Sequence, residues 1–260
     1  AALANPAALV TAPAQALFDT VPGRAVYFRT KYSLGGTELH SPDAPITESD
    51  ARLQNLATRG AVSADSPLIA GFVATGGGQR LLVRGVGPTL ATFGLAGVLA
   101  DPQISLFPAG GATATAANND WTDAAAFAAA GAFSFPVGSK DAALVFNTPV
   151  AAGGFTAVVS GVAGTSGVGL VEIYDMVSGV PAVGVPRLIN VATRGDVSAG
   201  APLIAGFVLC GTGPRRVLIG AAGPGLAALK VAKAMTDPAL ALYRGATLLA
   251  ENDDWSRSRS

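Results

Sequence analysis

The sequence predicts an all-β protein made of two tandem antiparallel β-sandwich repeats, jelly-roll-like in form, of which the second is incomplete. Two observations carry this prediction. Short apolar runs alternate with turn residues, and the 260 residues include 33 Gly and 17 Pro, a pattern typical of antiparallel sandwiches. A long stretch of the chain also occurs twice, which indicates a duplicated domain.

The first copy contains six short runs rich in Val, Ile, Leu and Phe, and each predicts a strand. They are residues 68–73, 80–84, 104–107, 142–146, 155–160 and 169–174. The last two runs alternate in the way that a half-buried strand requires. Helix is expected only at residues 89–93, at their counterpart 225–233, and in the alanine run 123–130, which Thr122 or Asp123 would cap.

The repeat itself is specific. The segment RLQNLATRGAVSADSPLIAGFV begins at Arg52, and RLINVATRGDVSAGAPLIAGFV begins 135 residues later, at Arg187. The match continues, with small gaps, to ANNDW at residues 117–121 and ENDDW at residues 251–255. Chance does not restore so many short motifs in the same order, so the chain carries a duplication.

This repeat divides the chain into three parts. Residues 1–51 form an N-terminal arm, residues 52–186 form copy one, and residues 187–260 form copy two. Copy two has the front strands PLIAGFV, RRVLIG and LALY, but no counterpart of residues 142–174. A sandwich that lacks three strands exposes apolar side chains and unpaired edges, at a cost above the stability of an ordinary domain. Either a longer chain or another segment must therefore complete copy two.

The arm is one source of a missing strand. Its residues 24–32 alternate, which places Val26, Phe28, Thr30 and Tyr32 on one face. The arm either packs on copy one of its own chain or adds to copy two of a neighbouring subunit, head to tail. Because the arm precedes copy one, we expect that reaching copy two of the same chain means crossing a full domain, which favours the neighbour. The acceptor side chains are then Phe207, Val217, Ile219, Leu240 and Leu242.

Charge and hydropathy bear on the partners. The chain has 17 Lys and Arg against 17 Asp and Glu, and this balance argues against nucleic acid or an anionic membrane as a partner. Half of the residues are hydrophobic, and an uncharged apolar surface favours self-association. The longest uncharged stretch, residues 142–171, is interrupted by Asn, Pro and Gly, so we expect no membrane span.

No catalytic site is expected. His40 is the only histidine and Cys210 the only cysteine, which excludes a disulfide framework and a zinc site built on cysteines. We find no pair of nucleophile and base in the sequence. The prediction is a protein without enzymatic activity.

Two clusters of oxygen-bearing side chains are candidates for calcium binding, the one cofactor considered. They are Asn118, Asn119, Asp120 and Asp123 in copy one, and Glu251, Asn252, Asp253 and Asp254 in copy two. The alternative is a pair of Asx-rich turns whose side chains cap the backbone. Trp121 and Trp255 follow the clusters, as plugs over the end of a sandwich or as platforms for sugar.

The chain resembles a known family in the segments ISLFPAGGATATAANNDW, GGFTAVVSGVAGTSGVGLVEIYD and LALYRGATLLAENDDW. These are similar to the hairpin and following strand of the bacterial pre-peptidase C-terminal domain. The whole unit, with RLxNxATRG and GPxLAxxG, also resembles tandem repeats of large secreted bacterial proteins. The resemblance covers residues 52–255 and implies an extracellular or cell-surface location and a non-catalytic role.

We therefore expect an extracellular structural subunit that forms a head-to-tail homopolymer, or filament, through strand complementation. The alternative is an accessory module of a larger secreted protein that binds glycan or a cell surface.

Overall fold

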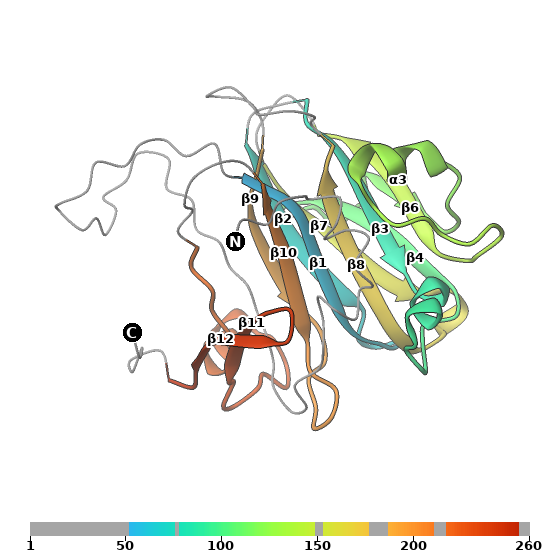
Figure 1. The fold of residues 1–260 in the computed structure, drawn as a ribbon. Helices are drawn as coiled ribbons and strands as arrows, with labels where there is room; N and C mark the ends of the chain where they lie inside the picture. Colours follow the sequence, from blue (N-terminus) through green and yellow to red (C-terminus); the bar gives the residue numbers. More distant parts are fainter. Residues whose placement is uncertain (1–51, 76–77, 149–152, 177–186, 211–216, 255–260) are drawn as a thin grey trace.

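The computed structural model describes residues 52–75, 78–148, 153–176, 187–210 and 217–254. Strands dominate, and all of their ladders are antiparallel (Figure 1). The all-β prediction is confirmed. No helix in the described part of the chain is long and apolar enough to cross a membrane.

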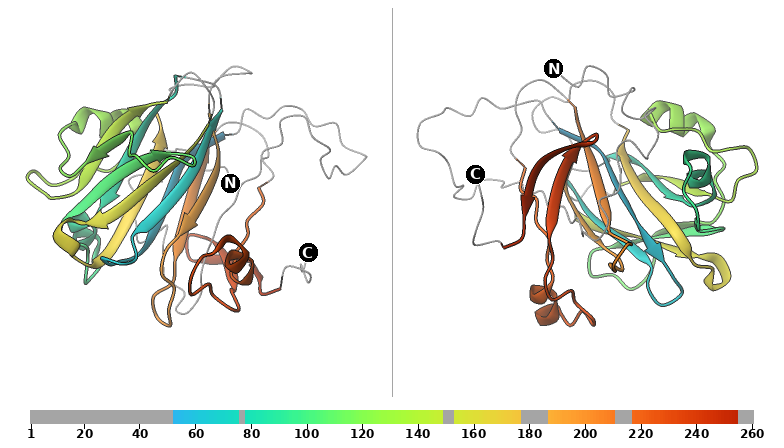
Figure 2. Two further views of the ribbon diagram at one scale, coloured as in Figure 1. Left: turned by 180° about the vertical axis from the view of Figure 1, so that it is seen from behind. Right: turned by 60° about the horizontal axis from the view of Figure 1, so that its bottom comes forward.

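The main sheet consists of two groups of strands. One group runs β10 (Ile204–Cys210), β1 (Arg52–Val62), β8 (Gly167–Asp175), β3 (Arg80–Val86) and β6 (Ala142–Asn147). The other runs β5 (Ala116–Asn118), β4 (Pro102–Pro108), β7 (Gly153–Gly161), β2 (Leu68–Thr75) and β9 (Arg187–Arg194). The groups are joined where Leu53 of β1 pairs with Leu188 of β9, and Figures 1 and 2 show them facing one another.

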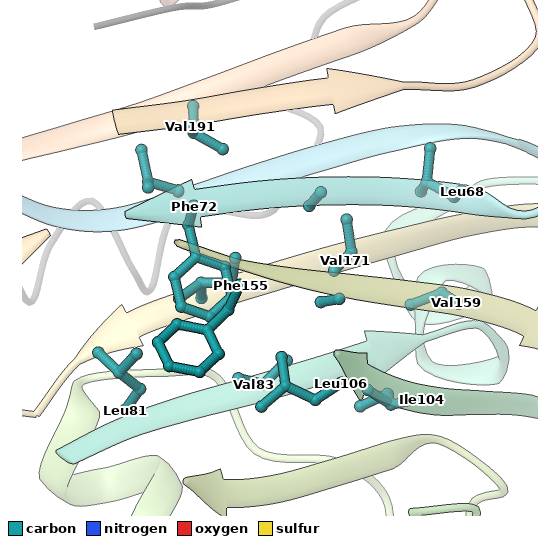
Figure 3. Close-up of a cluster of buried hydrophobic side chains, with 14 of the residues drawn as sticks. Leu68, Phe72, Leu81, Val83, Ile104, Leu106, Phe155, Val159, Val171 and Val191 are labelled. Carbon is teal, nitrogen blue, oxygen red and sulfur yellow. The ribbon is translucent and has the colours of Figure 1, made fainter. Parts of the chain in front are cut away.

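The main core lies between the two groups of strands. Alternate residues point into it, as strand geometry requires: Leu81 and Val83 of β3 and Leu106 of β4 have no exposed surface. Two of its rings, Phe72 of β2 and Phe155 of β7, stack with centroids 5.6 Å apart (Figure 3). We call this buried set the inner cluster.

A second cluster covers the other face of β3 and β8. It contains Leu82 and Leu170 from these strands and Phe127 from helix α3 (Ala124–Ala130). Asp123 caps α3 by accepting a hydrogen bond from the Ala126 N–H at 3.0 Å, so the predicted helix and one of its two predicted caps are confirmed. Because β8 is buried on both faces, its sequence is apolar at nearly every position.

The other sequence predictions have mixed outcomes. Six predicted strands correspond to β2, β3, β4, β6, β7 and β8. The predicted helices at 89–93 and 225–233 are the short 3-10 helices η1 (Pro88–Phe93) and η3 (Pro224–Leu229), and a third, η2, spans Val162–Gly164. The strand predicted at RRVLIG is wrong in its described part, because residues 217–220 form no ladder. Its copy-one counterpart, β3, is held between β6 and β8, which copy two lacks.

The strand pairing between the copies repeats with the offset of the sequence repeat. Arg59 of β1 pairs with Ile204 of β10, and Ile69 of β2 pairs with Arg194 of β9. Arg194 lies 135 positions after Arg59, and Ile204 lies 135 positions after Ile69. The second pair therefore repeats the first with the two copies exchanged. Leu53 pairs with Leu188, its own counterpart. Each copy thus covers one edge strand of the other: β10 pairs with β1, and β9 pairs with β2.

Candidate assembly interface

The outer edge of β10 is the first component of the candidate interface. One edge of β10 pairs with β1 over Ile204–Cys210, and in the described part of the chain no strand pairs with the other edge. Its copy-one counterpart, β2, has β7 at that position, paired from Leu68 to Ala74. We call the side of β10 that faces away from β1 the β10 edge. Unpaired N–H and C=O groups on such an edge are a template for another strand.

Equivalent side chains differ in burial between the two copies. Phe72 is 2% exposed and stacks on Phe155, whereas its counterpart Phe207 is only half-buried. Leu82 is 1% exposed, whereas its counterpart Leu218 is 60% exposed. The equivalent side chains are therefore less buried in copy two than in copy one.

The structure brings three of the predicted acceptor side chains together. Phe207, Ile219 and Leu242 all pack against the inner cluster while staying half-buried. Val217 and Leu240 are also half-buried, and their copy-one counterparts, Leu81 and Ile104, are at most 1% exposed. Three of the five predicted acceptor side chains therefore pack on the inner cluster while part of their surface stays exposed.

The C-terminal hairpin also has fewer strand partners than its counterpart in copy one. Strands β11 (Leu240–Arg244) and β12 (Thr247–Asn252) pair with Leu240 opposite Asn252, as Ile104 of β4 pairs with Asn118 of β5. In copy one, β4 also pairs with β7 along its length, but the β11–β12 hairpin forms a sheet of two strands only. Leu248 and Leu249 of β12 are 45% and 50% exposed. Figures 1 and 2 show the hairpin on the side of the main sheet where β9 and β10 lie.

The predicted donor side chains Val26, Phe28, Thr30 and Tyr32 lie outside the described residues. The point where the arm joins β1 is described, and it corrects one expectation. Arg52, the first residue of β1, pairs with Cys210 at the end of β10. The arm therefore joins the domain directly beside copy two of its own chain, and no domain has to be crossed to reach the β10 edge.

The first acidic turn uses its side chains locally. Asn118 Oδ1 accepts the Ala143 N–H at 2.9 Å, and Asn118 Nδ2 donates to the Asp120 carbonyl at 2.8 Å. The Asp120 carboxylate pairs with Lys140 at 3.1 Å, with both side chains about half exposed, and Asp123 caps α3. Asn119 is exposed.

The second turn repeats part of this arrangement, since Asn252 Nδ2 donates to the Asp254 carbonyl at 3.1 Å. Glu251, Asp253 and Asp254 are exposed. Among the residues that the structure describes, no group of three or more His, Cys, Asp or Glu is arranged to hold a metal ion. Calcium binding stays a prediction, and the contacts observed are those of Asx turns and caps.

Trp121 packs inside the second cluster. Its ring lies 5.4 Å from Phe127 and 5.9 Å from Phe135, and Nε1 donates to Ser139 Oγ at 3.1 Å. These contacts suit the plug better than the sugar platform. Trp255 lies outside the described residues.

A buried polar network that the sequence patterns did not predict lies under α3. The Arg84 side chain has no exposed surface, and its Nε donates to Glu172 Oε2 at 2.9 Å. Arg84 Nη1 donates to the Phe133 carbonyl at 2.6 Å, and the guanidinium lies 4.0 Å from the Phe133 ring centroid and 4.4 Å from that of Phe135. The available signal was a charged residue inside each of two apolar strands, RLLVRGV and GVGLVEIYD.

Tyr174 completes this network by donating to Glu172 Oε1 at 2.9 Å. Burial raises the pKa of the Tyr174 phenol well above its ordinary value, and the negative charge of Glu172 adds to the effect. Arg84, Glu172 and Tyr174 are all enclosed by protein, so the network holds α3 and the segment after it against the sheet. It presents no group to a substrate.

Comparison with known proteins adds no further constraint: no family model matches the chain, and no curated protein or solved structure is similar to it.

Proposed function

We propose that this chain is a non-catalytic, extracellular structural subunit that polymerises head to tail through strand complementation. In this proposal copy one is a complete β-sandwich, and copy two is a sandwich that a neighbour completes. The observation that carries the proposal is the difference in burial between equivalent side chains: Phe72 against Phe207, and Leu82 against Leu218.

The energetic argument follows from these pairs. Full burial of a Leu, Ile or Phe side chain is worth about 1.5–3 kcal/mol. Phe207, Ile219 and Leu242 are half-buried against the inner cluster, so a strand that covered them would gain about half of such a contribution from each. The total is then about 2–5 kcal/mol, a sizeable fraction of the stability of a domain.

The shape of the acceptor also supports strand addition. The β10 edge continues an existing antiparallel ladder, so an extended segment adds backbone hydrogen bonds as well as side-chain contacts. The arm, residues 24–32, has alternating apolar residues suited to such a strand. Extracellular location rests on the resemblance to secreted bacterial modules.

The glycan-binding alternative receives no specific support from the part of the chain that the structure describes. A sugar platform needs an exposed aromatic ring, and Trp121 is packed against Phe127 and Phe135.

The test is negative-stain microscopy of the full chain and of three variants. Filaments are expected from the full chain, and deletion of residues 1–50 or Phe207→Asp should abolish them. Val137→Asp is the matched control, because Val137 is 98% exposed and belongs to neither core cluster. Circular dichroism should show copy one still folded in the deletion variant. Filaments that persist undiminished after the deletion would overturn the proposal.

A further inference from the structure

We infer that two of these chains exchange copy two and form a closed dimer. In this dimer, β9 and β10 of each chain pair with β2 and β1 of the other chain, through the ladders that a single chain makes within itself. The interaction surface is the pair of copy-one strands β1 and β2, and its partner is a second copy of this chain. The inference uses described strands only, so it is independent of the arm and of the proposed function.

The strands of copy two depend on copy one for their partners and their core. Within the described part of the chain, β9 and β10 form ladders with β1 and β2 only (Figure 1). Their buried apolar side chains, Leu188, Val191, Leu203 and Ala205, belong to the inner cluster, most of which comes from copy one. The same ladders and the same core form whichever molecule supplies copy one.

The closest contact between the copies uses equivalent residues from each. A Cβ atom added to Gly60 would lie 2.9 Å from Leu203 Cδ1 and 3.2 Å from Leu68 Cδ1, and one added to Gly195 would lie 3.0 Å from both. Gly195 is the counterpart of Gly60, and Leu203 is the counterpart of Leu68. This approach requires glycine in both copies. Each copy supplies one glycine and one leucine, so a copy from a second chain presents the matching groups.

Exchange alters the connection between the copies and leaves their ladders unchanged. Residues 177–186 connect the copies, and a connection of this length sets an effective concentration on the order of 1 mM. During folding, a second chain at about 100 µM therefore captures copy two in about one chain in ten. After one exchange, the two remaining partners are held in the same complex, so the second exchange closes the dimer.

An exchanged dimer should separate slowly. Its ladders run from Arg52 to Arg59 in β1 and from Ile69 to Thr75 in β2. Both ladders must open, and inner-cluster side chains must leave the core, before the chains part. A dimer held by surface contacts separates without any such opening. The rate of separation therefore distinguishes the two kinds of dimer.

Single cysteines on separate chains test the inference. Thr58 of β1 is directly opposite Ala205 of β10, and opposite Cα atoms in antiparallel strands lie about 4.5–5.5 Å apart, a distance that a disulfide spans. In a Cys210→Ser background, full chains with Thr58→Cys are mixed with full chains with Ala205→Cys, unfolded, and refolded together at about 10 and about 100 µM. Linked peptides are identified by mass spectrometry after oxidation. Each chain carries one cysteine, so a link between positions 58 and 205 always joins two chains.

Two controls accompany this mixture. The double variant Thr58→Cys with Ala205→Cys, refolded in dilute solution, should form the link within one chain and so show that the two positions are close enough. Val137→Cys in place of Ala205→Cys measures random oxidation, because Val137 is 98% exposed and belongs to neither core cluster.

The link between chains should rise about tenfold between the two concentrations and exceed the Val137→Cys control at both. A link no more frequent than in that control, while the double variant links within one chain, overturns the inference. Filaments whose chains lack the link also overturn it and leave the proposed function standing. Linked dimers without filaments support the inference and overturn the proposed function.

The unmodified chain provides a second test if the cysteine variants fail to fold. It is refolded at about 100 µM, filaments are removed by centrifugation, and the supernatant is diluted about a hundredfold and followed by size-exclusion chromatography with light scattering. A dimer of about one chain in ten should persist for hours after dilution, because separation requires both ladders to open. A dimer that disappears within minutes, or no dimer at all, overturns the inference.

Discussion

Replacing Arg84 by methionine is expected to destabilise copy one strongly. The Arg84 side chain is completely buried and that of Glu172 is 5% exposed, so the variant leaves a carboxylate that water cannot reach. Removing one partner of a buried ion pair costs about 3–5 kcal/mol. The Phe133 carbonyl also loses its donor, which adds about 1 kcal/mol or more. The loss is then about 4–6 kcal/mol, a large part of the stability of a domain.

Urea unfolding followed by tryptophan fluorescence measures this loss. Trp121 packs on Phe127 and Phe135, which also line the Arg84 site, so its emission reports on the relevant cluster. The shift in midpoint, multiplied by the slope of the transition, converts to a free energy. Lys140→Met is the control, since it breaks an exposed pair with Asp120 and should cost about 1 kcal/mol or less.

The double variant Arg84→Met with Glu172→Met shows whether the loss of stability comes from an unpaired buried charge. If the loss comes from an isolated buried charge, replacing both partners by apolar side chains should recover most of it. A single variant within about 1 kcal/mol of the parent, or a double variant less stable than the single one, would refute the assignment of a buried, mutually dependent pair.

Three further predictions concern pH, metal and domain boundaries. Burial raises the pKa of Tyr174, so the unfolded chain loses the phenolic proton at a lower pH than the folded chain does. Stability should therefore fall as the pH rises above about 10. Urea midpoints measured between pH 8 and 11 should show this decline, and Tyr174→Phe should reduce it. Excess chelator should lower the melting temperature by several degrees if the two acidic turns bind calcium; an unchanged melting temperature would show that they act as caps, in agreement with the hydrogen bonds that Asn118 and Asp123 accept. A fragment of residues 52–186 should be folded by circular dichroism and dimeric by light scattering. In this fragment β1 loses its partner β10 and β2 loses its partner β9, and β1 of one fragment can pair with β2 of another. A stable monomer would contradict the predicted dimer, and an unfolded fragment would contradict the domain boundary.

Local patterns in the sequence predicted the parts of the fold that depend on local burial. Residues 155–160 alternate because β7 buries every second side chain, and residues 68–73 are apolar because β2 lies in the core. The longest strand, β1, was missed because RLQNLATRGAV contains Gln, Asn and Gly, which are not typical of strands. Its place in the sheet depends on pairing with β8 and β10, and a local pattern does not contain that information.

The duplication explains why the partly buried side chains of copy two were predictable. Copy one shows what each side chain of copy two would contact in a complete sandwich, so Phe207, Ile219 and Leu242 were identified without a structure. The strand at 217–220 was predicted on the same comparison and was wrong, because neighbours as well as sequence are needed to form a ladder. The junction of the arm was also placed wrongly, because chain order does not reveal that Arg52 lies beside Cys210.

The reciprocal pairing of the two copies also limits how they can diverge. Leu56 of β1 pairs with Phe207, and its counterpart Val191 pairs with Phe72. A substitution in either copy must therefore pack against a strand of the other copy. The strands that pair between the copies contain ATRG and LIAGFV in both copies. Arg84 lies on a strand that does not pair with the other copy, and its counterpart is Gly220. After duplication, a substitution in β1, β2, β9 or β10 must therefore fit a strand of the other copy, whereas positions outside this boundary, such as that of Arg84, are free of this requirement.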